Sequence, residues 1–212
     1  MTRSPFITAV LGILLAGALA AAPAGAMGQP ATSQSAVALH SALRKLWEEH
    51  IVYTRNYIIS ALAGLEDTAP VTERLLRNQD DLGSAIVPFY GEEAGKKLAG
   101  LLRAHIVIAT DIVTAAKAGD NDGVTTGEKS WHQNGEQIAD FLSGANPNWT
   151  RAAMSDMLSK HLDYTTTEIV SLLKGDWAAD IAAYDKGHEH MLMFADMLSD
   201  GIIKQFPAKF SK

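Results

Sequence analysis

Two histidines and two methionines lie close together in the stretch GHEHMLMF, residues 187–194. They are His188, His190, Met191 and Met193. Imidazole and thioether groups without thiolates suit copper, Cu(I) above all, whereas imidazoles alone suit zinc or Cu(II). Two residues two apart on a helix point about 200° apart, so His188 and His190 cannot chelate one ion from the same helix. An ion at this stretch therefore needs ligands from other helices.

Three further histidines, His50, His105 and His161, recur at intervals of 55 and 56 residues. Equivalent residues surround them: Leu46, Leu101 and Met157 stand four residues before, and Gly64, Gly119 and Gly175 stand fourteen residues after. A glycine at the end of a helical pattern is typical of a left-handed C-terminal cap. The repetition predicts three αα-hairpins of about 55 residues each.

Each of these three histidines lies on the apolar stripe of its predicted helix. Around His50, for example, Leu43, Trp47, Thr54 and Tyr57 recur at spacings of three and four residues and so share one face. A single hairpin cannot bury such a stripe alone, so the three hairpins must pack together. We therefore expect the three imidazoles to turn inward and to form one polar layer across the bundle.

In each hairpin, residues of the returning helix lie beside the histidine, at the same height along the bundle. Each turn comes about 15 residues after the histidine, so the level residue lies about 27 to 30 positions later. That window holds Asp80 in the first hairpin, His132 to Asn134 in the second and His188 to Met191 in the third, so these residues are expected to join the layer. On the last helix Ile181, Tyr184, His188 and Met191 recur at three and four residues and form an inward stripe, and His190 lies on a flanking face. The predicted metal-binding residues are His50, His105, His132, His161, His188, Met157 and Met191, with Asn134 and Asp80 as hydrogen-bond partners of the ligands.

The leading hypothesis is thus binding of a metal ion (copper or zinc) or a small ligand, and two other functions stay open. Inward histidines often only order a core, which would suit a structural or protein-interaction module. A hydrolase-like enzyme would use a layer histidine with Asp80 or Glu168 as acid and base. The sequence contains no HxxxH, HExxH or Glu-x-x-His pattern, no G-x-S-x-G motif and no glycine-rich phosphate loop.

The rest of the chain indicates an all-α protein. Helices are expected at 36–63, 70–86, 90–118, 127–144, 150–174 and 176–204, with Asp120–Gly123 as an Asx-rich turn. Pro88 and Pro147 are expected to open the second and third hairpins. The result is a six-helix bundle with sequential helices antiparallel, in one domain at 36–212.

Composition excludes several classes of partner and chemistry. The net charge of −6 argues against nucleic acid and anionic membranes as partners. The sequence has no cysteine, which excludes disulfides, thiolate metal ligands and a cysteine nucleophile.

The N-terminus has the pattern of a signal peptide. Arg3 precedes an apolar run at 6–22, and Ala24-Gly25-Ala26 fits the small-x-small cleavage rule. The alternative is a membrane anchor, since the run is near the lower length limit for a span. We expect cleavage of residues 1–26, a polar lead at 27–35, and a periplasmic or secreted protein without membrane contact. Cleavage removes one arginine and no acid, so the net charge changes from −6 to −7.

Four short segments also carry a family resemblance. They are LWEEH at 46–50, YTR at 53–55, LLRNQDDLG at 75–83 and PFYG at 88–91. Together they resemble an uncharacterised family of small exported bacterial proteins, over most of the mature chain. The resemblance implies an all-helical exported protein, and it carries over no catalytic residue.

Overall fold

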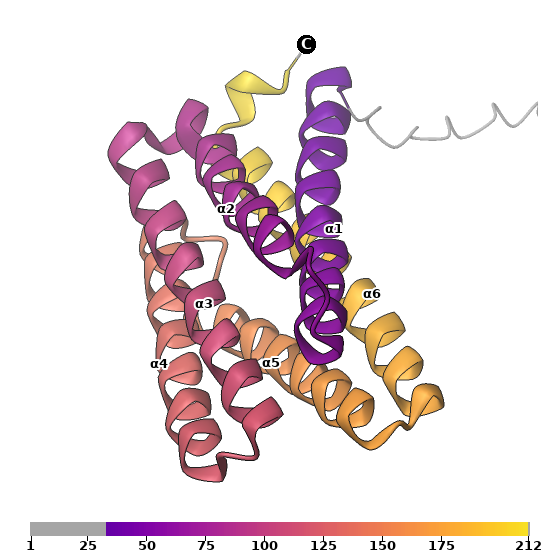
Figure 1. Cartoon of the computed structure of the whole chain (residues 1–212). Helices are drawn as coiled ribbons and strands as arrows, with labels where there is room; N and C mark the ends of the chain where they lie inside the picture. The colour runs from indigo at the N-terminus through magenta and orange to yellow at the C-terminus, as the bar shows by residue number, and fades with distance from the viewer. Residues whose placement is uncertain (1–32, 212) are drawn as a thin grey trace, which may run out of the picture. The chain divides into compact units, whose positions relative to one another are not determined.

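The computed structural model describes residues 33–211, and within this range the chain is helical throughout and has no strand (Figure 1). The elements are α1 (Gln34–Ala63), α2 (Thr68–Tyr90), α3 (Glu92–Ala118), α4 (Asn121–Ala145), α5 (Arg151–Lys174), α6 (Trp177–Gln205) and the short 3₁₀ helix η1 (Pro207–Lys209). The all-α prediction is confirmed. The predicted signal peptide and most of the polar lead lie outside the described residues.

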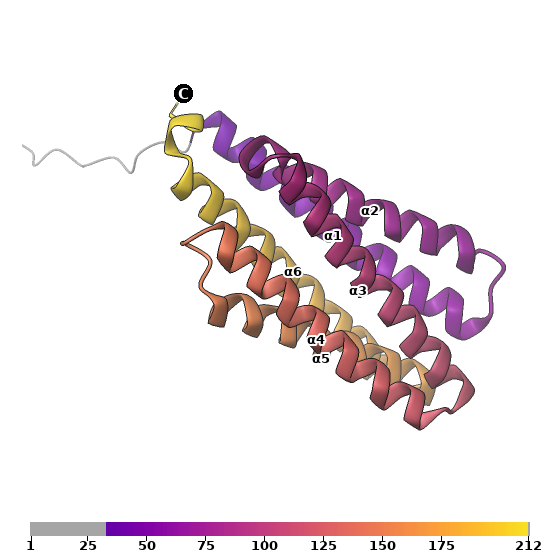
Figure 2. The ribbon, with the colours of Figure 1, turned by 90° about the vertical axis from the view of Figure 1, so that its left-hand side faces the viewer.

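The six helices form three antiparallel hairpins, α1–α2, α3–α4 and α5–α6. Each helix packs against its neighbours in the chain, and α6 also packs along α1, so the helices close a ring. Helix α1 makes further contacts with α3 and α5, which places the first helices of the three hairpins toward the centre. Figure 2 shows the hairpin turns at one end of the bundle, with the start of α1 and the C-terminus at the other.

The three hairpin turns follow from the predicted glycine caps. Gly64, Gly119 and Gly175 all adopt the left-handed conformation, with φ of 70°, 73° and 70°. The N–H of each glycine donates to carbonyls in the last turn of its helix, which satisfies groups that the helix end leaves open. The sequence repeat is therefore a structural repeat.

Two helix boundaries differ from the prediction by more than two residues. Helix α2 continues through Pro88 to Tyr90, because a proline in the last turn removes only one hydrogen bond, and Gly91, at φ 84°, ends the helix. Helix α4 begins at Asn121, because the Asp120 side chain accepts a hydrogen bond from the N–H of Gly123 and caps the helix. The expected Asx-rich turn is thus the first turn of α4.

The buried core is divided into one large and two small clusters. The large cluster draws on the N-terminal halves of α1, α3 and α5 and the C-terminal halves of the returning helices, and includes Trp47, Leu102, Ile138, Leu158 and Phe194. We call this region the apolar half. The two small clusters lie nearer the hairpin turns, and include Tyr57, Ile106, Ile112, Leu162 and Ile169. We call that region the turn half.

An ion cluster also joins three helices in the turn half. Arg55 of α1 donates two hydrogen bonds to Asp180 of α6, at 2.9 and 2.7 Å, and one to Glu168 of α5, at 2.7 Å. Both carboxylates are buried. The guanidinium group lies 4.6 Å from the ring centroid of Tyr184, which adds a cation–π contact.

Candidate functional site

The three repeated histidines meet inside the bundle, between its apolar and turn halves. His50, His105 and His161 are 2%, 3% and 3% exposed. The ring centroid of His161 lies 5.6 Å from that of His50 and 6.1 Å from that of His105. The expected inward orientation is confirmed, and we call these three residues the histidine layer.

One hydrogen bond repeats in all three hairpins and sets the height of the layer. A side chain of the returning helix contacts the carbonyl oxygen four residues before each histidine. Asn78 donates to Leu46 (3.0 Å), Asn134 donates to Leu101 (3.1 Å), and Nε2 of His190 lies 2.7 Å from the oxygen of Met157. The bonded residues are 32 apart in the first hairpin and 33 apart in the other two, so the three hairpins have nearly the same register.

His105 has a defined tautomer. Its Nδ1 lies 2.7 Å from Oδ1 of Asn134, whose amide nitrogen already donates to the backbone. Because the amide therefore presents its oxygen, Nδ1 of His105 carries the proton and donates it. The other ring nitrogen, Nε2, keeps its lone pair for a further ligand. Such a bond fixes ring orientation at metal sites and makes the imidazole more basic.

Gln79 lies next to His50 at the equivalent place in the first hairpin. Its Nε2 is 3.3 Å from Nδ1 of His50, and it also donates to the oxygens of Leu75 (2.8 Å) and Asn78 (3.1 Å). Its Oε1 is buried and has no hydrogen-bond partner among the residues described. The amide nitrogen has two hydrogens for these three neighbours, so it donates to His50 only in place of one of the two oxygens, or presents its own oxygen to His50 after rotation.

His161 is the least satisfied of the three histidines. Its Nδ1 is buried and has no hydrogen-bond partner within residues 33–211. His190 stands at the place that Asn134 takes in the second hairpin, but it contacts the carbonyl of Met157 and the ring of Tyr164 instead. A buried polar atom left without a bond costs about 1 to 3 kcal/mol, so this one is a candidate for binding.

A small cavity adjoins the histidine layer. All three histidines line it, together with Thr54, Trp131 and other residues of the turn half. About 20 Å³ is open to the centre of a water molecule, which is room for roughly one water or one ion. Oγ1 of Thr54 and Nε1 of Trp131 are also buried without partners in the described part of the chain. The cavity is too small for an organic ligand.

Burial keeps the histidine layer uncharged at neutral pH. Loss of hydration lowers the pKa of His50 to about 3, with repulsion from His105 as a second cause. The same loss lowers the pKa of His105 to about 4, partly offset by its bond to Asn134. Burial, and then repulsion from His50, lowers the pKa of His161 well below its usual value. Neutral imidazoles are the form that binds metal ions.

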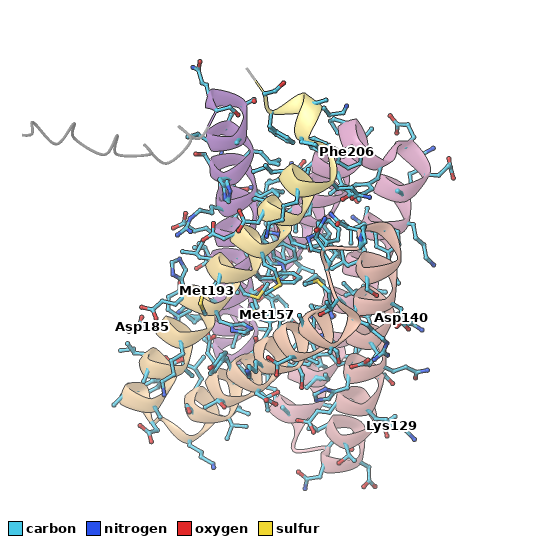
Figure 3. The ribbon with its side chains drawn as sticks, turned by 180° about the vertical axis from the view of Figure 1, so that it is seen from behind. Lys129, Asp140, Met157, Asp185, Met193 and Phe206 are labelled. Atoms are coloured by element: carbon cyan, nitrogen blue, oxygen red, sulfur yellow. The ribbon has the colours of Figure 1, made fainter. Side chains whose placement is uncertain are left out.

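The other predicted ligands do not join the layer. His132 is exposed, and His188 is half-buried, with Nε2 3.5 Å from a carboxylate oxygen of Glu48. Their predicted inward orientation is wrong. Met191 is buried in the apolar cluster, and Met157 is half-buried against it. Met193 lies on the outer side of α6, 57% exposed (Figure 3).

The error at His188 comes from the face assigned to α6. The prediction counted Ile181 as inward, but Ile181 is 54% exposed, while Asp180, Gly187 and His190 are buried. Asp180 is buried because it binds Arg55, a contact that apolar spacing does not reveal. A signal was nevertheless present: Gln79, Asn134 and His190 each stand 29 residues after the histidine of their own hairpin.

Asp80 and Glu168 do not approach the layer histidines. Asp80 is exposed and pairs with Arg103, and Glu168 belongs to the cluster with Arg55. Desolvation raises the pKa of Glu168 to about 7, although the guanidinium of Arg55 pulls the pKa down. Neither carboxylate lines the cavity. The arrangement therefore offers no acid–base pair with a layer histidine.

The site and the fold together define an all-α bundle of three hairpins around a buried histidine layer. Within residues 33–211, no three His, Asp or Glu side chains stand as a ready-made metal site, so a metal ion would require the rings to reorient. Comparisons of the chain with family models, curated proteins and solved structures found no match.

Proposed function

We propose that this protein binds one metal ion, copper or zinc, at the histidine layer of His50, His105 and His161. The observation that carries the proposal is the meeting of three neutral, buried imidazoles around a cavity of ion size. The three come from equivalent places in three hairpins, so the fold itself brings them together. His132, His188, Met157 and Met191 are not part of the proposed ligand set.

The unsatisfied polar atoms also support this proposal. His161 has a ring nitrogen without a partner, and His105 has its Nδ1 proton fixed by Asn134, which frees Nε2. Coordination would use both lone pairs and offset the cost of burying them. Rotation of the rings about their side-chain bonds would be needed to aim three nitrogens at one point.

Metal analysis of the purified protein tests the proposal. Protein is incubated with copper and zinc, dialysed, and assayed for metal per chain, as wild type, His161→Leu and His132→Leu. We expect one ion per chain for wild type and for His132→Leu, whose exposed histidine is a matched control. His161→Leu should bind at least about 100-fold more weakly, since changes even to the partners of ligands cost 10- to 100-fold. Equal binding by all three proteins, or none by wild type, would refute the proposal.

A second candidate function is structural, and the repeated hydrogen bond favours it. Asn78, Asn134 and His190 tie the hairpins at one height, and ordered polar layers specify a unique core. In that case the layer histidines only align the bundle. The metal assay separates the two candidates, because a purely structural layer binds no ion.

We also propose that the chain is exported to the periplasm or beyond. The support is the apolar run at 6–22 followed by Ala24-Gly25-Ala26. Intact-mass analysis of the protein from its native cells is expected to show a chain that begins at Met27. A chain that retains residues 1–26 would contradict cleavage and would favour the membrane-anchor alternative.

A further inference from the structure

We infer that the ion held by the histidine layer is monovalent copper, and that the site discriminates against zinc and other divalent ions. This inference rests on the proposed function and narrows it to one class of ion. Three features of the cavity favour monovalent copper: its lining carries no charge, its volume is small, and it presents three imidazoles.

The cavity beside the histidine layer offers a bound ion no negative charge. Its lining consists of histidines, threonines, aromatic residues and aliphatic residues, and no aspartate or glutamate. The buried carboxylates of Glu168 and Asp180 both bind Arg55 instead. Imidazoles are neutral ligands, so an ion in the layer would keep its full charge inside the bundle.

The cost of such burial depends steeply on the charge. The solvation energy lost on transfer to a low-dielectric interior grows with the square of the charge, so a dication loses about four times as much as a monocation of equal size. A zinc ion on three histidines commonly lowers its charge by binding hydroxide in the fourth position. The cavity, at about 20 Å³, suits about one water-sized species, so an ion and a hydroxide together would compete for the same space.

The number of available protein ligands also favours Cu(I) over zinc. The layer supplies three imidazoles, and His190, the fourth buried histidine, has its Nε2 on the carbonyl of Met157. Zinc sites are almost always four-coordinate, and three protein ligands are then completed by water. By ligand softness alone, three imidazoles would suit zinc or Cu(II). Here the uncharged lining and the supply of only three nitrogens decide the preference instead, because Cu(I) is stable with two or three neutral nitrogen ligands and needs no water.

Competition titrations compare the two ions directly. Wild type is titrated anaerobically with Cu(I) against a copper-selective chelator, and with Zn²⁺ against a zinc-selective dye. We expect Cu(I) to bind more tightly than Zn²⁺ by at least about 100-fold, and X-ray absorption to show nitrogen ligands alone. His161→Leu should lose Cu(I) binding. If Zn²⁺ binds to the layer as tightly as Cu(I), the inference fails and the proposed function stands. If neither ion binds, both fail.

A charge variant tests the reason for the discrimination. Thr54→Asp places a carboxylate on the cavity wall, and Thr54→Asn is the matched neutral control. The ratio of zinc to Cu(I) affinity should rise by at least about 10-fold in Thr54→Asp relative to Thr54→Asn. Ala109→Asp repeats the test from a second wall position should Thr54→Asp fail to fold. An unchanged ratio in a folded variant would overturn the charge argument.

Discussion

The apolar half and the turn half of the bundle are built by different means, although the same six helices run through both. The apolar half is closed by one continuous cluster, in which Trp47, Ile138 and Phe194 are nearly without exposure. The turn half has two smaller clusters and the Arg55 ion cluster. Each half encloses a cavity of about 20 Å³, but the cavity of the apolar half is lined by aliphatic and tryptophan side chains alone, whereas histidines and threonines line that of the turn half. Figure 1 shows the α3–α4 and α5–α6 hairpins spreading apart toward their turns.

This difference separates stability from candidate function. A continuous apolar cluster resists opening because every opening exposes many side chains at once. Both halves leave some space unfilled, but only in the turn half is the space lined by histidines and by the unpaired polar atoms of Thr54 and His161, and convergent polar groups are what a binding site needs. The histidine layer lies at the boundary, held in register by the apolar half and open to the cavity of the turn half.

Matched isoleucine truncations should show the largest difference in stability between the two halves. Ile138→Ala in the apolar half should lower the free energy of unfolding by about 4 kcal/mol, because the truncation enlarges a cavity that Ile138 already lines and that the large cluster holds open. Ile169→Ala in the turn half should cost about 2 kcal/mol, since its smaller cluster can relax. Urea denaturation measures both. Equal losses would mean that the two halves are packed alike.

Removing Arg55, the positively charged member of the ion cluster, should have the next largest effect on stability. Arg55→Met leaves Glu168 and Asp180 buried without their partner, and breaking a buried ion cluster in this way costs about 3 kcal/mol. Lys160→Met, which removes an exposed pair with Asp156, is the control and should leave the free energy of unfolding nearly unchanged. A loss at Arg55→Met no greater than at the control would show that the cluster does not stabilise the turn half.

The pH dependence of stability should come in part from Glu168. Its pKa is raised to about 7 in the folded protein from an ordinary 4.5. The folded state therefore holds this proton more tightly, and the resulting stability is complete below pH 4.5 and is lost as the pH rises through 7. Between pH 5 and 8, wild type should lose about 2 to 3 kcal/mol relative to Glu168→Gln. Urea denaturation at each pH measures the free energy of unfolding of both proteins. A difference between wild type and Glu168→Gln that stays constant from pH 5 to pH 8 would contradict the raised pKa.

The smallest expected difference lies within the histidine layer itself. His105→Leu removes the donor to Asn134 and leaves a buried amide oxygen unpaired, at a cost of about 2 kcal/mol. His161→Leu removes a nitrogen that has no bond, so the metal-free protein should change by less than about 1 kcal/mol. Thermal unfolding of the two metal-free variants tests whether His105→Leu loses more stability than His161→Leu. A greater loss at His161 would indicate a partner that the structure does not show.

The sequence predicted the parts of this molecule that repeat. Equal spacing of His50, His105 and His161, with a glycine after each, was enough to predict the hairpins and the inward histidines. It was not enough for the returning helices, because apolar spacing placed the exposed Ile181 inside and gave no sign that Asp180 is buried. That face is set by the pair between Arg55 and Asp180, which are 125 residues apart in the chain. A contact between side chains so distant leaves no local pattern.

The two ends of the described chain lie together, since the hydroxyl of Ser35 donates to the carbonyl of Lys209 at 3.4 Å. Because α6 packs along α1, the six helices form a closed ring, and the two ends of the described chain meet between α6 and α1. A circular permutant that joins these ends and opens at Gly91 would begin with the second hairpin and keep every helix beside the same neighbours. Which hairpin comes first in the chain is thus immaterial to the final architecture.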